Sequence, residues 1–369
     1  MIEVQNGVTR HPLWRMAEPV CLEIMEGEQI AIVGENGAGK SRLVEILTGH
    51  YPLLGDAIRY DFSPSPLKLV SENMKYIAFR DSYGDQDATY YYQQRWNQHD
   101  IDESTPTVGQ LLEDAFGKAD ESVGHGLDPR QQGALRASMQ EKREVLMRLF
   151  HLHDLYDKYI ISLSSGELRK FQLARALGSA PRMLVMDNPF VGLDSDTRIQ
   201  LRELLSSLIT QFGLQVILIV SRDVDIPDFI THVLPVAGNR LLPKQTRAEY
   251  LSQVQSPTPP YLSSEAREWI VNLPERPLDT EHFYPKQGGE ILKFDGVNIR
   301  YGSRTILSDL HWTVCEGQKR ALSGENGAGK STLLSLVCAD NPQGYACPIE
   351  LFGHRRGSGE SIWEIKHHI

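Results

Sequence analysis

The sequence of 369 residues predicts an α/β fold in which a sheet carries a glycine-rich loop between a strand and a helix, followed by an incomplete second copy. One octapeptide, Gly-Glu-Asn-Gly-Ala-Gly-Lys-Ser, occurs at residues 34–41 and returns at 324–331. An apolar stretch precedes each octapeptide and a helix-prone stretch follows it. The predicted strands are 29–33 and 320–323, and the predicted helices are 42–48 and 332–337. Strand, glycine-rich loop and helix form the context that a phosphate-binding loop requires.

The residue types of each octapeptide suit the binding of a nucleoside triphosphate, and both copies match the pattern G-x-x-x-x-G-K-[ST]. Glycines let backbone N–H groups surround phosphate oxygens, and the following helix directs its N-terminus at the same anion. Lys40 and Lys330 are expected to reach the β- and γ-phosphates of ATP, and Ser41 and Ser331 to hold Mg²⁺. The predicted nucleotide-binding residues of the two loops are Gly34, Asn36, Gly37, Ala38, Gly39, Lys40, Ser41 and Arg42, and Gly324, Asn326, Gly327, Ala328, Gly329, Lys330, Ser331 and Thr332.

The composition is that of an ordinary globular protein, with 41% hydrophobic and 23% charged residues. A net charge of −10 disfavours broad nucleic-acid binding, because no basic surplus exists to replace counterions. The four cysteines show no metal-site spacing, which indicates reduced thiols in the cytoplasm. Because no apolar run approaches about 18 residues, no transmembrane segment is expected; peripheral attachment at the inner membrane stays open.

Several elements are predicted between the two loops. Strands are expected at 57–60 and 76–79, and helical spacing covers 106–117 and 131–156. An aromatic and glutamine-rich cluster at 90–97 lies between them. Its simplest interpretation is a surface segment that packs aromatic rings onto a helical subdomain.

A second series of motifs follows at 163–223. Leu-Ser-Ser-Gly-Glu at 163–167 precedes an amphipathic helix, and its small residues predict a second helix N-terminus suited to an anion; taken alone, the motif is an ordinary N-cap. The apolar strand 183–187 ends in Asp187, the arrangement by which a strand presents a carboxylate to Mg²⁺. A helix at 195–211 and a strand at 215–220 come next.

The domain boundaries are predicted from proline and from the repeat. The first domain takes in 1–240, a proline-rich linker 241–289, and the second domain 290–369, with short strands at 291–294 and 297–301. The sequence ends 38 residues after Ser331. A full domain of this kind needs on the order of 200 residues, so the second copy is expected to be truncated.

The order of these motifs resembles the ATP-binding-cassette (ABC) ATPases. The resemblance rests on the phosphate loop, the 163–167 signature, the strand ending in Asp187, and Gly-Leu-Asp at 192–194. It implies a P-loop cassette with a mixed core sheet, an antiparallel β subdomain and a helical subdomain. It also implies head-to-tail pairing with a second cassette, in the same chain or in a dimer. The signature residues that would close over ATP on the other cassette are Ser164, Ser165, Gly166 and Glu167.

The resemblance extends to the adenine-stacking position. Tyr301 stands where such proteins place an aromatic side chain on adenine, and in the first copy His11 and Trp14 are both candidates. Residues 91–97 and 187–194 resemble the tandem, soluble ModF-type members, which are named for molybdate transport or photorepair.

The sequence departs from the family pattern at its expected catalytic positions, Asp187, Asn188 and Arg222. Asn188 replaces the usual glutamate and can orient a water but cannot take its proton. Arg222 replaces the usual switch histidine, and the nearest glutamine to the expected Q-loop position is Gln86. Slow hydrolysis is therefore expected at the first site, and feeble turnover overall because the second copy lacks its catalytic groups.

Two functions remain open at this point. The chain can be an ATPase subunit that drives a membrane transporter through a helical subdomain near residues 80–130. Alternatively, it can be a soluble regulatory or translation-associated module with no transport role. The proline-rich stretch 240–289 is unlike the long charged linkers of ribosome-associated ABC proteins. A phosphate-loop kinase is disfavoured by the signature and by Gly-Leu-Asp at 192–194.

Overall fold

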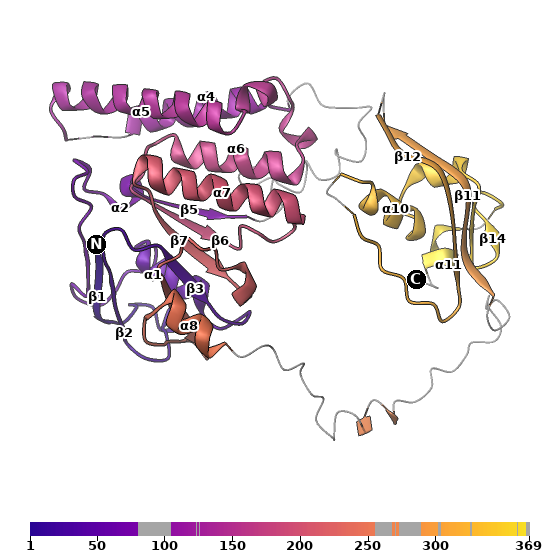
Figure 1. Cartoon of the computed structure of the whole chain (residues 1–369), viewed down its shortest axis with the longest axis horizontal. Helices are drawn as coiled ribbons and strands as arrows, with labels where there is room; N and C mark the ends of the chain where they lie inside the picture. Colours follow the sequence, from indigo (N-terminus) through magenta and orange to yellow (C-terminus); the bar gives the residue numbers. More distant parts are fainter. Residues whose placement is uncertain are drawn as a thin grey trace. The chain divides into compact units, whose positions relative to one another are not determined.

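The structure is a computed structural model, and its described residues fall into two compact units (Figure 1). The described ranges are 1–79, 105–254 without 123 and 125, 268–269, 271–272, and 289–366 without 302, 303, 325, 326 and 360. The first unit contains those up to 254 and the second those from 268 onward. The aromatic cluster at 90–97, Gln86 and Asn326 lie outside the described residues.

A seven-stranded sheet forms the centre of the first unit. Its strands are β10 (Gln245–Thr246), β8 (His232–Ala237), β3 (Ile30–Val33), β7 (Gln215–Val220), β6 (Met183–Asp187) and β5 (Met74–Ala78) in that order, with β9 (Arg240–Leu241) beside β8. The strands from β8 to β5 are parallel, and β9 and β10 pair antiparallel to β8. Every residue of β3 and β7 is buried, as expected for parallel strands covered on both faces.

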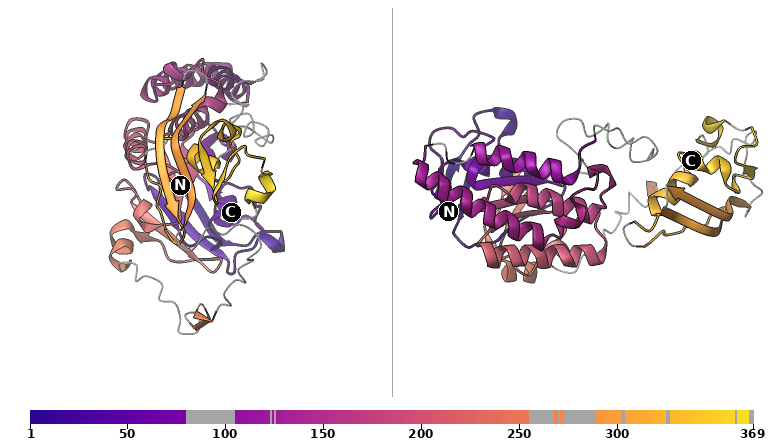
Figure 2. Two further views of the ribbon diagram at one scale, coloured as in Figure 1. Left: turned by 90° about the vertical axis from the view of Figure 1, so that its right-hand side faces the viewer. Right: turned by 90° about the horizontal axis from the view of Figure 1, so that it is seen from above.

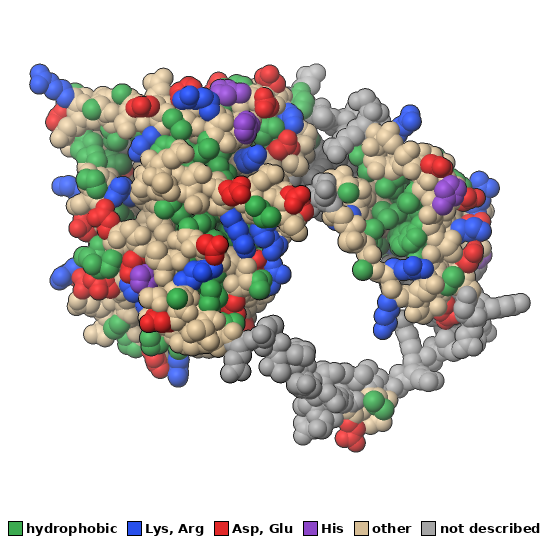
Figure 3. Space-filling view, in the orientation of Figure 1, with side chains coloured by type: hydrophobic (Ala, Val, Ile, Leu, Met, Phe, Trp, Pro, Cys, Tyr) green, Lys and Arg blue, Asp and Glu red, His purple; other side chains and the backbone are tan. Residues whose placement is uncertain are grey.

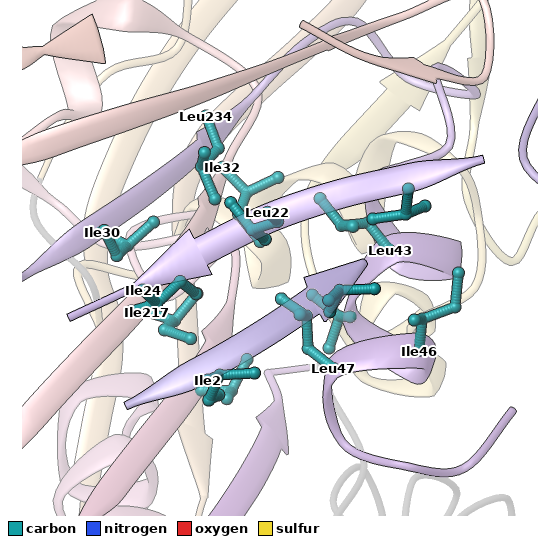
Figure 4. Packing of buried hydrophobic residues seen from close by; sticks show 14 of the residues in the cluster. Ile2, Leu22, Ile24, Ile30, Ile32, Leu43, Ile46, Leu47, Ile217 and Leu234 are labelled. Atoms are coloured by element: carbon teal, nitrogen blue, oxygen red, sulfur yellow. The ribbon is translucent and has the colours of Figure 1, made fainter. Parts of the chain in front are cut away.

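An antiparallel sheet joins the same core. It consists of β2 (Val20–Ile24), β1 (Ile2–Gly7) and β4 (Ile58–Tyr60). Figure 4 shows Ile2 and Ile24 of this sheet in one cluster with Leu47 of helix α1 (Lys40–Leu47) and with Ile30 and Ile217 of the core sheet. The helix that follows the phosphate loop is therefore fixed by apolar packing against both sheets.

Helices cover the core sheet and form a further layer beyond it (Figures 1 and 2). They are α2 (Val70–Asn73), α4 (Val108–Ser122), α5 (Pro129–Leu149), α6 (Ser165–Leu177), α7 (Ser195–Phe212) and α8 (Arg247–Gln253), with 3₁₀ turns at Pro12–Trp14, Leu152–Leu155, Ile160–Ser162 and Asp223–Asp225. The predicted helix 131–156 ends at Leu149, because His151 adopts a left-handed φ of 53°. No helix among the described residues is long and apolar enough to cross a membrane.

The second unit repeats the first strand pair and the phosphate-loop helix of the first unit. It contains β11 (Glu290–Tyr301), β12 (Arg304–Cys315), β13 (Ile349–Leu351), β14 (His354–Arg355), α10 (Lys330–Val337), α11 (Ile362–Lys366) and a 3₁₀ turn at Pro342–Ala346. Its sheet order is β12–β11–β13–β14. Leu292 pairs with Val314 as Ile2 pairs with Ile24, so the strand register recurs 290 residues later. The sequence repeat is thus a structural repeat.

The predicted strand 320–323 does not form. In the first copy, β3 is hydrogen-bonded on both sides by β7 and β8, whereas no described strand of the second unit pairs with 320–323. Leu322 is 41% exposed, while its counterpart Ile32 is fully buried.

Hydrophobic side chains gather on the surface of the second unit (Figure 3). They line a cavity of about 170 Å³ that includes Trp312 and Val337.

The first unit continues beyond residue 240, into the stretch that the sequence analysis assigned to the linker. Strand β10 pairs with β8, and α8 follows it. The Tyr250 hydroxyl donates a hydrogen bond to Asp223 Oδ1 at 2.7 Å, which ties α8 to the turn after β7. Later in the predicted linker, the Asn272 N–H donates to the Glu268 carbonyl at 3.0 Å, as in one helical turn.

Arg143 holds the outer helices together, and its loss should destabilise the first unit. Its side chain in α5 is buried and donates to both carboxylate oxygens of Asp120 in α4, each at 2.8 Å, and to the Gly178 carbonyl at 2.7 Å. Arg143→Ala should lower the free energy of unfolding by about 2–4 kcal/mol, measured by urea denaturation with circular dichroism. Arg148→Ala, an exposed position near the end of the same helix, should change it by less than about 0.5 kcal/mol. Equal losses from both variants would contradict this account.

Candidate nucleotide site

Glycine is required at both ends of the first phosphate loop. Gly34 has a φ of 152°, and a Cβ atom there would lie 2.2 Å from the Val236 carbonyl oxygen. Gly39 adopts a left-handed φ of 104° as the N-cap of α1, and a Cβ atom would lie 2.6 Å from Asn239 Oδ1. Between them, Asn36 and Gly37 are exposed and Ala38 is buried. At Gly34 and Gly39 the backbone therefore adopts a position that only glycine permits, and the loop ends at the N-terminus of α1.

Lys40 is buried and turned back onto the loop. Its Nζ donates to the carbonyls of Gly34 at 2.6 Å and Glu35 at 2.8 Å. Burial lowers the pKa of Lys40 from its ordinary value, and the nearby Asp187 carboxylate partly opposes this shift. The ammonium group is thus positioned to exchange loop carbonyls for phosphate oxygens.

The parallel pairing brings distant residues to one edge of the sheet. Val33 is in register with Val220, and Asp187 with Ile219. The phosphate loop, Ser221 and Asn188 therefore directly follow the carboxyl ends of the adjacent strands β3, β7 and β6. Ligands of open α/β sheets bind at that edge.

A chain of hydrogen bonds connects these strand ends. The Tyr76 hydroxyl donates to Asp187 Oδ2 at 3.1 Å, and Asn188 Nδ2 donates to Asp187 Oδ1 at 2.7 Å. Ser221 Oγ lies 3.1 Å from Asn36 Oδ1 and 3.3 Å from Asn188 Oδ1. The sequence analysis did not select Tyr76 or Ser221. The sequence could have indicated Ser221, because it directly follows the buried strand 215–220. Tyr76 lies within the predicted strand 76–79, and nothing in the sequence marks it as a site residue.

The Arg222 side chain forms an ion pair with Asp225. Its Nε lies 2.9 Å from Asp225 Oδ2, and Arg198 also pairs with this buried carboxylate, at 3.0 Å. Ser221, rather than Arg222, is the residue of this turn that contacts Asn36. The Asp225 side chain therefore pairs with the guanidinium that the sequence analysis placed at the switch-histidine position.

The oxygen donors near the loop suit Mg²⁺. Ser41 lies exposed in the first turn of α1, and a hydroxyl and a carboxylate are ligands that Mg²⁺ accepts alongside phosphate oxygens. Both Asp187 oxygens accept hydrogen bonds from neutral donors, Tyr76 and Asn188, which orient the carboxylate. Among the described residues, no cluster of three or more His, Cys, Asp or Glu could hold a metal by itself. Ser41 and Asp187 therefore fit a magnesium ion held largely by its nucleotide.

The signature residues form the rigid start of α6. Ser164 is the N-cap: the Glu167 N–H donates to its Oγ at 3.3 Å, and the Ser164 N–H donates to Glu167 Oε2 at 2.8 Å. Burial would raise the pKa of Glu167, but hydrogen bonds from Lys158 and Ser164 outweigh it, so that pKa lies below its usual range. A Cβ atom on Gly166 would lie 3.0 Å from Thr197 Cγ2. Ser165 is the first residue of the helix.

The described glycines of the second phosphate loop have φ values close to those of their counterparts in the first. Gly324, Gly327 and Gly329 have φ values of 153°, 86° and 86°, and Lys330 Nζ donates to the Gly324 carbonyl at 2.7 Å. Ser331 is exposed, whereas Thr332 is buried. The Tyr301 hydroxyl accepts a hydrogen bond from Asn341 Nδ2 at 3.0 Å. Ala328 lies between Gly327 and Gly329 and is exposed, whereas its counterpart Ala38 is buried.

His11 and Trp14, the two candidates for adenine stacking at the first site, lie in one aromatic stack. The His11 and Trp14 rings stack at 4.6 Å, and Trp14 and Tyr51 at 4.3 Å. The Arg15 carbonyl accepts from Arg42 at 3.2 Å and from Asn239 at 2.9 Å. Both candidate rings therefore belong to one stack, which includes Tyr51, a residue that the sequence analysis missed. Arg42 tethers this segment to α1.

The comparisons with known proteins agree with this geometry. A family model described as ABC transporter matches residues 17–191 and 307–352. The chain is 35% identical over 349 residues to the ABC transporter ATP-binding protein ModF of Escherichia coli, covering 94% of this chain and 64% of ModF. An uncharacterized ABC transporter ATP-binding protein of Schizosaccharomyces pombe is 27% identical, with 98% of this chain and 68% of that protein covered.

A solved structure shows the fold. That of cbiO1 from Clostridium perfringens, part of the ABC transporter complex cbiONQ, matches with a TM-score of 0.50 and 17% identity, covering 74% of this chain and 95% of that one. The α/β phosphate-loop fold predicted from the sequence is confirmed. The chain belongs to the ABC transporter family of ATP-binding proteins.

Proposed function

We propose that this chain binds ATP with Mg²⁺ at both phosphate loops, hydrolyses it slowly at the first, and so drives or regulates a partner. The observation that carries the proposal is the meeting of the Lys40 loop, Asp187 and Asn188 at one edge of the core sheet.

Binding depends on the exchange of one set of partners for another. The γ-phosphate would replace the Gly34 and Glu35 carbonyls around the Lys40 ammonium. Loop N–H groups and the α1 N-terminus would surround the remaining oxygens. Mg²⁺, when held by Ser41 and Asp187, would neutralise charge on the phosphates. Lys330 and Ser331 would act in the same way in the second unit.

Hydrolysis is limited by the group beside Asp187. The Asn188 amide is fixed by its hydrogen bond to Asp187, so its oxygen can accept a hydrogen bond from a water molecule. An amide does not take a proton near neutral pH, so the step lacks a general base. The proposed turnover is therefore slow.

Pairing of cassettes would complete each site. The N-terminus of α6, with Ser164, Ser165, Gly166 and Glu167, would close over ATP held by another cassette, in the same chain or in a second copy. The hydrogen bonds between Ser164 and Glu167 keep this helix end ordered for that contact.

Two roles are candidates for this chain: the ATPase subunit of a membrane transporter and a nucleotide-gated regulatory module. A membrane transporter subunit that contacts the helices around α4 and α5 would place the chain at the cytoplasmic face of the inner membrane. A nucleotide-gated regulatory module is favoured by Asn188, because slow hydrolysis suits a switch. Molybdate enters only through the names of relatives. Recovery of a tagged chain with washed membranes would support the transporter, and recovery with the soluble fraction the regulatory module.

Restoring an acid beside Asp187 should accelerate the reaction. Asn188→Glu introduces a carboxylate that can accept a proton, and steady-state phosphate release should rise at least about tenfold. Asn188→Gln keeps an amide and should show no such gain. The φ of 50° at this position strains both variants alike, so the comparison isolates the proton acceptor. No gain from Asn188→Glu would show that the missing base is not limiting.

The two lysines should differ in their effects on turnover. Lys40→Ala should abolish the slow phosphate release, because Lys40 belongs to the unit that contains Asp187 and α6. Lys330→Ala should weaken nucleotide binding in the second unit yet leave slow release measurable. Lys118→Ala, an exposed position on α4, serves as the control. Fast release that only Lys330→Ala removes would contradict the proposal.

A further inference from the structure

We propose that Ser221 is a positioning residue of the first nucleotide site, and that its hydroxyl ties the Asn188 amide to the phosphate loop. This inference rests on the proposed function, since the reaction that Ser221 would serve is ATP hydrolysis at that site.

The chemistry of Asp187 sets the orientation of Asn188. A carboxylate only accepts hydrogen bonds, so the Asn188 NH₂ group must face Asp187 Oδ1, at 2.7 Å. The amide oxygen then points to Ser221, whose Oγ is 3.3 Å away. The Ser221 hydroxyl is thus the donor placed to hold the reactive end of this amide.

Ser221 faces two acceptors with one proton. Asn36 Oδ1 of the phosphate loop is 3.1 Å from Oγ, and Asn188 Oδ1 is 3.3 Å from it. The hydroxyl can fully satisfy only one of them at a time. A change in the contacts of Asn36, such as phosphate entering the loop, would therefore change the hydrogen bonding of Asn188.

The backbone that presents Ser221 is well anchored. Ser221 follows the central strand β7, between the strands that lead to Asn36 and Asn188. In the turn that follows, Asp225 is paired with Arg198 and Arg222, and the Val224 carbonyl accepts from Arg202 at 3.0 Å. Tyr250 donates to Asp223. These contacts hold the hydroxyl in place and leave Arg222 occupied, so the bridging role falls to Ser221.

Ser221→Ala should lower kcat about three- to tenfold, the range expected when one hydrogen bond is lost. The dissociation constant of ATP, measured by equilibrium titration, should change less than about twofold. Ser221→Thr keeps the hydroxyl and should recover most of the loss. Ser207→Ala is the matched control, because that hydroxyl on α7 donates to the Glu203 carbonyl of its own helix, at 2.9 Å.

A double-mutant cycle separates positioning from a general structural effect. If Ser221 acts through Asn188, then Ser221→Ala should have no further effect on kcat in an Asn188→Ala background. Additive losses, or a wild-type kcat for Ser221→Ala, would overturn this inference while the proposed ATPase function stands. A wild-type protein that releases no phosphate from ATP would instead contradict the proposed function, and this inference with it.

Discussion

The parallel pairing of β3, β7 and β6 is the constraint on which the first site depends. Their register places the phosphate loop, Ser221 and Asn188 at one edge, although Ser221 and Asn36 of the loop are 185 positions apart in the chain. Burial of every β3 and β7 side chain fixes that register. A slip of one residue would exchange the faces against which these side chains pack and would separate the polar groups at the strand ends.

Local patterns predicted much of the fold. Strands 183–187 and 215–220 formed as predicted, because unbroken apolar runs suit strands that are buried on both faces. Strand 320–323 did not form, since a strand needs hydrogen-bond partners that a local pattern cannot reveal. Residues 245–253 joined the first unit through pairing with β8 and through Tyr250, contacts that proline spacing does not indicate.

In the candidate site, too, the sequence predicted residues that belong to local motifs and missed those that depend on contacts between distant residues. The sequence indicated the two loops, Asp187 and Ser164, because each belongs to a motif with a local mechanism. It did not indicate Tyr76 or Ser221, whose roles arise from side chains that meet across strands. Arg222 was placed at the switch-histidine position from the sequence order alone, and its pairing with Asp225 arises from the turn after β7.

The two copies share a loop and differ in their surroundings, so nucleotide binding by both is the central claim. Isothermal titration of the intact chain with ATP and Mg²⁺ tests it most directly, using the Lys40→Ala and Lys330→Ala variants to assign each site. The account predicts two bound nucleotides per chain, reduced to one by either substitution. A stoichiometry of one that Lys330→Ala leaves unchanged would contradict it, because the second loop would then have the phosphate-binding form without the function.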